Sequence, residues 1–158
     1  MTWRCKIIIA YAINCRYRHV MFDRCIYFNT TALARQLDRI WSKAFAPFDL
    51  TPPQGFMLRA ILARPGLLQS ELADELKIAR ATATRGLDGL EAKALIVRNK
   101  STRDKRESAI TPTAEALAIM DALNAASGAT TEKLATLFGE TVFAGFVEQA
   151  RDIASKLE

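Results

Sequence analysis

The chain has 158 residues, 50% of them apolar, and a mean hydropathy near zero, which excludes a disordered chain and a bundle of membrane helices. This length predicts a domain with its own core. Lys and Arg number 22 against 17 Asp and Glu, which gives a formal net charge of +5 at pH 7. The excess favours a polyanionic partner, although ordinary solubility charge is an equally simple explanation on its own.

The cysteine pattern argues against a secreted, disulfide-bonded protein. Cys5, Cys15 and Cys25 all lie in the first 25 residues, and an odd number outside the expected core fits a reducing compartment. We therefore expect a cytoplasmic protein. No two cysteines are two to four residues apart and the sequence has a single histidine, His19, so neither a metal site nor a cofactor is expected.

Residues 1–24 read as an atypical N-terminal extension. The charged start and the apolar run at 7–13 superficially resemble a signal peptide, but the run is short, contains Tyr11 and is followed by no Ala-x-Ala cleavage site. The run is also too short to span a bilayer, so no membrane contact is expected. Met21 opens ordinary globular sequence, and residues 1–20 are either an unusual extension or the product of an upstream start.

Two helices are predicted next in the chain. Apolar residues recur every three or four positions between Asn29 and Phe45, which predicts an amphipathic helix that ends before Pro47. The stretch TPPQ at 51–54 is a helix start, with a capping threonine, a proline at the first helical position and a glutamine three residues after the cap. This second helix is expected to end before the Arg-Pro-Gly break at 64–66.

Residues 67–96 have the pattern of two short helices joined by a turn at 77–79. Two short helices joined in this way make a helix-turn-helix, the alternative being a generic helical corner. The apolar residues that mark the two helices are Leu68, Leu72, Ala73 and Leu76 in the first, and Ala83, Leu87, Leu90 and Ala94 in the second.

The exposed face expected for the second helix suits a DNA major groove. Opposite its apolar stripe, the N-terminal half carries small side chains, two hydroxyls and an arginine. Arg85 is long enough to reach a guanine edge, and Thr82 or Thr84 can bond a phosphate or touch a thymine methyl. Arg80 lies in the first turn, where free backbone N–H groups also favour a phosphate. The residues predicted to contact DNA are Arg80, Ala81, Thr82, Thr84 and Arg85.

The charged stretch STRDKRES at 101–108 follows the helix pair, between VRNK and ESAI. Alone, such a run is usually a solvated surface. Between two strand-like segments it predicts the tip of a small β-hairpin, or wing, which completes a winged helix-turn-helix domain at 51–112. Residues 113–158 read as helices with more apolar surface than a small monomer covers, so we expect them and the helix at 25–50 to form a dimer. The predicted fold class is mainly α with a small β-wing.

These motifs together resemble the winged-helix transcription regulators of the multiple-antibiotic-resistance (MarR) family. The resemblance is carried by SELADELKIARATATRGLDGLEAKALIVR, TRDKRES and ITPTAEAL. It implies a homodimer that reads a pseudo-palindromic operator in double-stranded DNA, most often as a repressor. It also implies a cleft for a small aromatic or phenolic effector whose binding weakens DNA affinity.

The resemblance also assigns roles within the wing. In this family a wing arginine enters the minor groove and a nearby aspartate orients it, which implies Arg106 and Asp104 here, with Lys105 and Arg103 as phosphate contacts. The chain departs from the family pattern at three helix ends, however. Ala79 and Leu68 replace common capping residues, a loss of about 1 kcal/mol each, and Ala94 replaces the usual glycine in a left-handed turn.

Two alternative functions remain, and an enzyme is not expected. One branch of the family senses organic peroxides through a cysteine whose place here falls on Tyr27, so Cys25 lies two residues, about 200°, away on the helix. Thiol sensing by Cys25 is the first alternative, and a winged-helix module that contacts only proteins is the second. The sequence has no Ser/His/Asp or Cys/His set and no glycine-rich phosphate loop.

Overall fold

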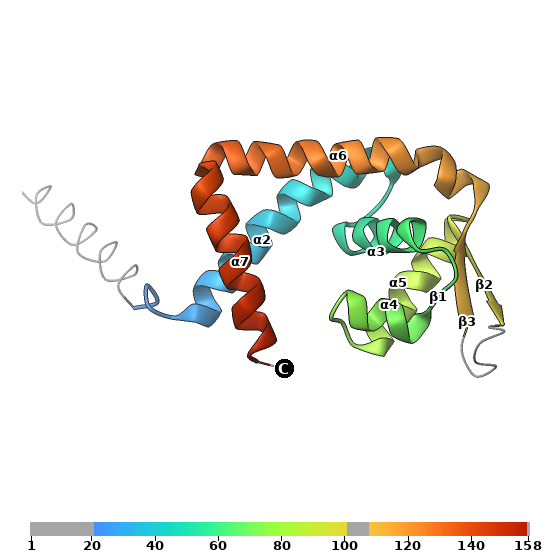
Figure 1. The fold of residues 1–158 in the computed structure, drawn as a ribbon, viewed down its shortest axis with the longest axis horizontal. Coiled ribbons are helices and arrows are strands. Elements are labelled where there is room, and N and C mark those ends of the chain that lie inside the picture. Colours follow the sequence, from blue (N-terminus) through green and yellow to red (C-terminus); the bar gives the residue numbers. More distant parts are fainter. Residues whose placement is uncertain (1–20, 101–107, 158) are drawn as a thin grey trace, which may run out of the picture. The chain divides into compact units, whose positions relative to one another are not determined.

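The computed structural model of the chain describes residues 21–100 and 108–157, which form helices and one small antiparallel sheet (Figure 1). The predicted fold class is thereby confirmed. By its contacts the chain divides inside its first described helix, between Arg39 and Ile40, into two compact units. The elements are α2 (Ile26–Phe45), the 3-10 turn η1 (Ala46–Phe48), α3 (Pro52–Ala63), β1 (Leu67–Leu68), α4 (Gln69–Glu75), α5 (Arg80–Ala92), β2 (Ile96–Lys100), β3 (Ser108–Pro112), α6 (Ala114–Phe138) and α7 (Glu140–Ser155).

A turn tied down by one side chain precedes α2 in the first unit. The Asn29 side-chain amide donates hydrogen bonds to the carbonyl oxygens of Phe22, Asp23 and Cys25, at 3.0, 3.1 and 2.9 Å. The rings of Phe22 and Phe28 stack with their centroids 4.8 Å apart. Helix α2 begins at Ile26, three residues before the predicted start at Asn29. The sequence pattern missed residues 26–28 because their side chains are exposed and do not extend the apolar stripe of the helix.

Helix α3 starts with the predicted capping box. The Thr51 hydroxyl accepts a hydrogen bond from the Gln54 backbone N–H at 3.5 Å, and the Gln54 side-chain oxygen accepts one from the Thr51 N–H at 3.2 Å. The helix then buries most of its apolar residues in the core of the second unit, among them Met57, Leu58 and Ile61. The predicted start and end of this helix are both confirmed.

The predicted helix pair is present as α4 and α5. The connection between them includes Lys77, whose φ of 52° is left-handed, and the Ile78 N–H returns to the Ala73 carbonyl at 3.0 Å. Helix α5 ends at Ala92, two residues before the prediction. Ala94 is exposed and lies outside the apolar stripe, because its φ of 56° places it in the turn that follows the helix.

The sheet has the order β1-β3-β2, and all its pairs are antiparallel. Strands β2 and β3 form the predicted hairpin, in a register that pairs Ile96 with Pro112 and Lys100 with Ser108. Strand β1 was not predicted: Leu67 and Leu68 pair with Ile110 and Ala109, whereas the sequence pattern assigned Leu68 to a helix. Two buried residues are too few to show the alternation that marks a strand.

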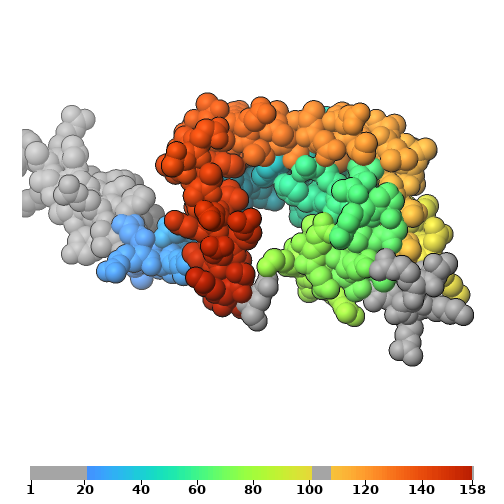
Figure 2. Space-filling view, viewed as in Figure 1, coloured from blue at the N-terminus to red at the C-terminus, as the bar shows by residue number. Residues whose placement is uncertain are grey.

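The two C-terminal helices differ in burial. Helix α6 continues through Gly128 and buries Leu123, Ser127 and Leu134. Gly139, with a φ of 84°, separates it from α7, which contacts α6 but has no buried residue (Figure 2). No helix in the part of the chain that the structure describes is both long enough and apolar enough to cross a membrane.

Candidate nucleic-acid interface

Helix α5 turns one side to the core and the other to solvent. Ala83, Leu87 and Leu90 are buried, which confirms three members of the predicted apolar stripe. On the opposite side the predicted contact residues Arg80, Ala81, Thr82 and Arg85 are exposed, and Thr84 is half-buried. The N-terminal half of α5 therefore offers small side chains and two arginines at the surface, a shape that fits into a major groove.

Two glycines bring α5 close to α3. A Cβ at Gly86 would lie 2.6 Å from the Met57 methyl carbon, and one at Gly89 would lie 2.5 Å from the Gln54 side-chain nitrogen. A glycine inside a helix costs roughly 0.5–1 kcal/mol relative to alanine. Here the tight packing against α3 offsets that cost, so contacts with α3 set the position of α5.

The hydroxyl of Thr84 is engaged within the protein. It accepts a hydrogen bond from the Gln69 side-chain amide at 2.7 Å and donates one to the Arg80 carbonyl at 3.0 Å. Gln69 is the first residue of α4, so this contact joins the two helices of the pair. The Thr84 hydroxyl therefore has less capacity to bond a phosphate than the sequence suggested. The exposed Thr82 hydroxyl, which accepts a hydrogen bond from the Arg85 guanidinium at 3.5 Å, has more capacity than Thr84.

An ion-pair cluster joins α5 to strand β2. The Arg98 guanidinium donates from Nε to Glu91 at 3.0 Å and from Nη2 to Asp88 at 2.7 Å, and Nη2 also bonds the same Glu91 oxygen. The hydrogen bond from Arg98 lowers the pKa of Glu91, and the bond to Glu91 raises the pKa of Arg98. Asp88 lies on the exposed face predicted for this helix, but its carboxylate is directed to Arg98. The sequence carries no signature of this cluster beyond two acidic residues three positions apart before a basic strand.

Two further contacts fix the base of the wing. The Thr113 hydroxyl accepts from the Ala116 N–H at 3.2 Å, which caps α6, and donates to the Ala94 carbonyl at 2.8 Å. At the other side of the same turn, Lys93 pairs with the Asp49 carboxylate and donates to the Asp49 carbonyl at 2.6 Å. The turn that carries the strained Ala94 is therefore held from both sides.

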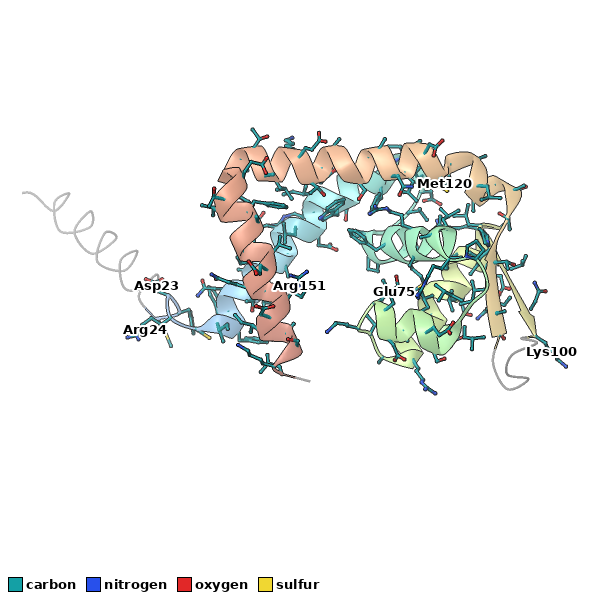
Figure 3. The ribbon with its side chains drawn as sticks, in the orientation of Figure 1. Asp23, Arg24, Glu75, Lys100, Met120 and Arg151 are labelled. Atoms are coloured by element: carbon teal, nitrogen blue, oxygen red, sulfur yellow. The ribbon has the colours of Figure 1, made fainter. Side chains whose placement is uncertain are left out.

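The predicted wing-tip residues Arg103, Asp104, Lys105 and Arg106 lie outside the described residues, which stop at Lys100 and resume at Ser108. Lys100, the last described residue of β2, is exposed and projects away from the sheet (Figure 3).

The helix ends bear out the predicted losses in part. Ala79 precedes α5 and provides no side-chain cap. Leu68 has no polar atom to cap α4, but the Glu71 carboxylate accepts a hydrogen bond from the Leu68 backbone N–H at 2.8 Å, which supplies half of a capping box. One end thus keeps a partial substitute for its missing cap.

Cys25 is a free, half-buried cysteine directly before α2, and Tyr27, two residues on, is exposed. Within the described ranges no three His, Cys, Asp or Glu side chains come close enough together to hold a metal ion.

A second group of contacts lies where α3 meets α6. Arg59 donates from Nε to the Asn124 side-chain oxygen at 2.8 Å and from Nη1 to the buried Ser127 hydroxyl at 2.5 Å. Its guanidinium carbon lies 5.9 Å from the centre of the Phe56 ring, and that ring meets Trp41 edge-on at 5.0 Å. Among the described residues, the Arg59 partners are thus neutral oxygens and an aromatic ring.

Comparison with known proteins identifies the domain that carries α5. The family model described as the MarR family matches residues 48–107. Residues 48–107 are therefore similar to the domain that this family shares. An uncharacterized HTH-type transcriptional regulator of Bacillus subtilis, YybA, is 35% identical over 81 residues, which are 51% of this chain and 54% of the relative. The chain thus spans about half the length of this curated relative.

Solved structures share the fold of a longer part of the chain than the family model matches. The transcriptional repressor CouR, bound to a 23-mer DNA duplex, superposes with a TM-score of 0.78 at 24% identity, over 86% of this chain and 96% of that one. The PcaV transcriptional regulator of Streptomyces coelicolor, in complex with its natural ligand, gives a TM-score of 0.79 at 20% identity, over 87% and 96%. At these identities the likeness establishes the fold.

Proposed function

We propose that the chain is a sequence-specific regulator of transcription that binds double-stranded DNA as a homodimer and acts as a repressor. The observation that carries this proposal is the surface of α5, where Arg80, Ala81, Thr82 and Arg85 are exposed while Ala83 and Leu87 hold the helix in the core. The match of residues 48–107 to the MarR family and the DNA-bound state of the similar structure, CouR, support the same function.

Within this proposal each part of the surface has a separate task. Arg85 reads a guanine edge in the major groove, and Arg80 and Thr82 bind phosphates. In the wing, Arg106 enters the minor groove, Asp104 orients it, and Lys105 and Arg103 bind phosphates. Base contacts then determine the sequence, whereas phosphate contacts determine affinity and its dependence on salt.

The test uses a duplex that the wild-type chain selects from random-sequence DNA. Arg85→Ala is expected to weaken binding to that duplex by about 1–3 kcal/mol and to relax selectivity at one base pair. Arg106→Ala is expected to weaken binding as well. Arg64→Ala is the matched control, because it removes one charge from an exposed ion pair with Glu75 and is not among the residues proposed to contact DNA. Binding by Arg85→Ala and Arg106→Ala at wild-type strength would instead indicate a module that contacts only proteins.

Dimerisation is proposed through the terminal helices. Helix α7 has no buried side chain in a single chain, although it carries Val142, Phe146, Val147 and Ile153, all at least 46% exposed. A stable helix with this apolar content needs a covering surface, and a second copy provides one by symmetry. The two α5 helices of such a dimer would read the two halves of a pseudo-palindromic site.

Release by a small aromatic or phenolic effector is the remaining part of the proposal. Support comes from the contact between α3 and α6, where Arg59 lies near the Phe56 ring and that ring, 36% exposed, meets Trp41 edge-on. Benzoate and phenol, the simplest members of the two chemical classes, are suitable probes. At least one of them is expected to release the wild-type chain from the duplex and to do so less effectively with Arg59→Ala. Equal release of both proteins would contradict a role for Arg59.

A further inference from the structure

Arg98 lies on the side of the wing that faces α5, which is the recognition helix of the proposed function. Side chains alternate along a strand, so Arg98 shares a face of β2 with Ile96, which is buried, and with Lys100, which is exposed. In the sheet Arg98 is paired with Ile110, which is also fully buried. Arg98 therefore stands halfway between the core and the start of the wing tip, with 23% of its side chain exposed.

The direction in which β2 leaves α5 depends on the sheet, on the turn at Ala94 and on the ion pairs of Arg98. Strand β2 is at the edge of the sheet and pairs only with β3 within the described residues. It joins α5 through the turn at Ala94, where the Ala94 and Leu95 N–H groups bond the carbonyls of Glu91 and Leu90 at 2.9 and 3.0 Å. Beyond this turn, the contact between Arg98 and the carboxylates of Asp88 and Glu91 holds the middle of the strand to the helix.

The cluster of Arg98, Asp88 and Glu91 fixes the direction of the Arg98 side chain more than it stabilises the fold. Exposed ion pairs contribute little to folding, but an arginine that binds two carboxylates has its planar group fixed in direction. The charges also matter near DNA. Asp88 and Glu91 lie three residues apart on α5, where like charges repel each other, and Arg98 reduces their combined charge from −2 to −1.

We propose that Arg98 is a positioning residue of the DNA-binding surface: through Asp88 and Glu91 it sets the direction of the wing relative to the recognition helix. This inference rests on the proposed function. It also assigns Asp88 as a support of the wing, so this carboxylate does not read a base even though it lies on the exposed face of α5. The position of Arg106 in a minor groove would then depend on a side chain that touches no DNA.

The experiment compares two footprints on the duplex selected by the wild-type chain. Hydroxyl-radical cleavage reports protection of the minor groove by the wing, and dimethyl sulfate reports protection of guanine N7 by α5. Arg98→Ala is expected to lose the minor-groove protection, to keep the guanine protection and to bind roughly tenfold more weakly. Asp88→Asn combined with Glu91→Gln is expected to have the same footprint, because it removes the partners and leaves the arginine.

Three controls separate this role from general effects. Arg64→Ala removes the same charge from another surface ion pair and is expected to keep both footprints. Arg98→Lys keeps the charge but not the planar group, so it is expected to retain the fold without restoring the full minor-groove protection. Thermal unfolding of each variant shows whether the fold is retained, and the double carboxylate variant carries the test if Arg98→Ala does not fold.

The outcomes distinguish this inference from the proposed function. Full minor-groove protection by Arg98→Ala and by the double carboxylate variant would overturn the role of Arg98 and leave the DNA-binding function intact. If the wild-type chain selects and protects no duplex, the proposed function is wrong and this inference falls with it.

Discussion

Helices α3 and α7 have similar shares of apolar residues but very different surroundings. Helix α3 buries Met57, Leu58, Ile61 and Leu62 within its own chain, between α5 and α6. Helix α7 buries none of its side chains. An apolar residue contributes to folding only when something covers it. The core that holds α3 is therefore covered within one copy, whereas the apolar surface of α7 is covered only in the proposed dimer.

The largest expected effect tests the α3 side of this comparison. Ile61→Ala removes a side chain that is fully buried and should destabilise folding by about 2–5 kcal/mol, as measured by urea unfolding. Ile153→Ala makes the same chemical change on α7, where the isoleucine is 46% exposed. Its cost should be smaller at low protein concentration and should grow as the concentration rises. Equal costs at every concentration would remove the distinction between the two helices.

The next prediction concerns the covering surface of α7. Phe146→Glu places a charge on a ring site that is 49% exposed in one chain, so it should halve the mass measured by sedimentation while leaving the helical signal of the DNA-binding half. Glu148→Gln is the matched control, because residue 148 lies about 200° away on the helix. A dimer mass that Phe146→Glu leaves unchanged would mean that another surface holds the dimer, and a wild-type chain with the mass of one copy would contradict the proposed dimer.

A smaller effect is expected where α6 leaves the wing. Thr113→Val keeps the shape of the side chain but removes the oxygen that caps α6 and the hydrogen bond to the Ala94 carbonyl. The cost should be about 1 kcal/mol in thermal unfolding. Thr111→Val, on β3 two residues earlier, is the control, and a loss of equal size there would show that β-sheet contacts outweigh the cap.

Ala94→Gly is expected to stabilise the chain. Ala94 has a φ of 56°, which glycine adopts without strain, so the substitution should raise the free energy of unfolding by up to about 1 kcal/mol. Ala92→Gly, two residues earlier in the last turn of α5, should have the opposite sign because glycine is unfavourable in a helix. A loss of stability in both variants would show that the turn is not strained.

The smallest predicted effect depends on pH. Arg98 lowers the pKa of Glu91 below its ordinary value of 4.5, so the ion pair contributes a constant stability at neutral pH and loses it as the pH falls through the lowered pKa. The difference in Tm between the wild-type chain and Glu91→Gln should therefore be present at pH 7 and shrink below about pH 4. A difference that does not change with pH would assign the effect to shape alone.

Local signals predicted most of the helices. The TPPQ start of α3, the pair α4 and α5 and the strands of the hairpin each have a signature of a few adjacent residues. The contacts that position α5 have no such signature. Gly86 and Gly89 matter because of Met57 and Gln54, about 30 residues away, and the sequence pattern cannot show which residues meet across the core.

The candidate site was predicted to a similar extent. Arg85 and the flanking Thr82 were placed on the exposed face from the helical period, and Arg80 was placed in the first turn; the structure exposes all three. The period could not reveal that the hydroxyl of Thr84 bonds Gln69 or that Asp88 is held by Arg98. Both contacts join different elements, so they depend on how the elements pack and not on the order of residues in either one.

The uncovered surface of α7 has a consequence for how many copies of the chain a cell must make. If the form that binds DNA is a dimer, its amount rises with the square of the amount of chain while most chains are single. Doubling synthesis would then raise the binding form about fourfold, and dilution at cell division would lower it as steeply. A helix with no buried side chain would in this way make occupancy of the operator respond sharply to gene expression.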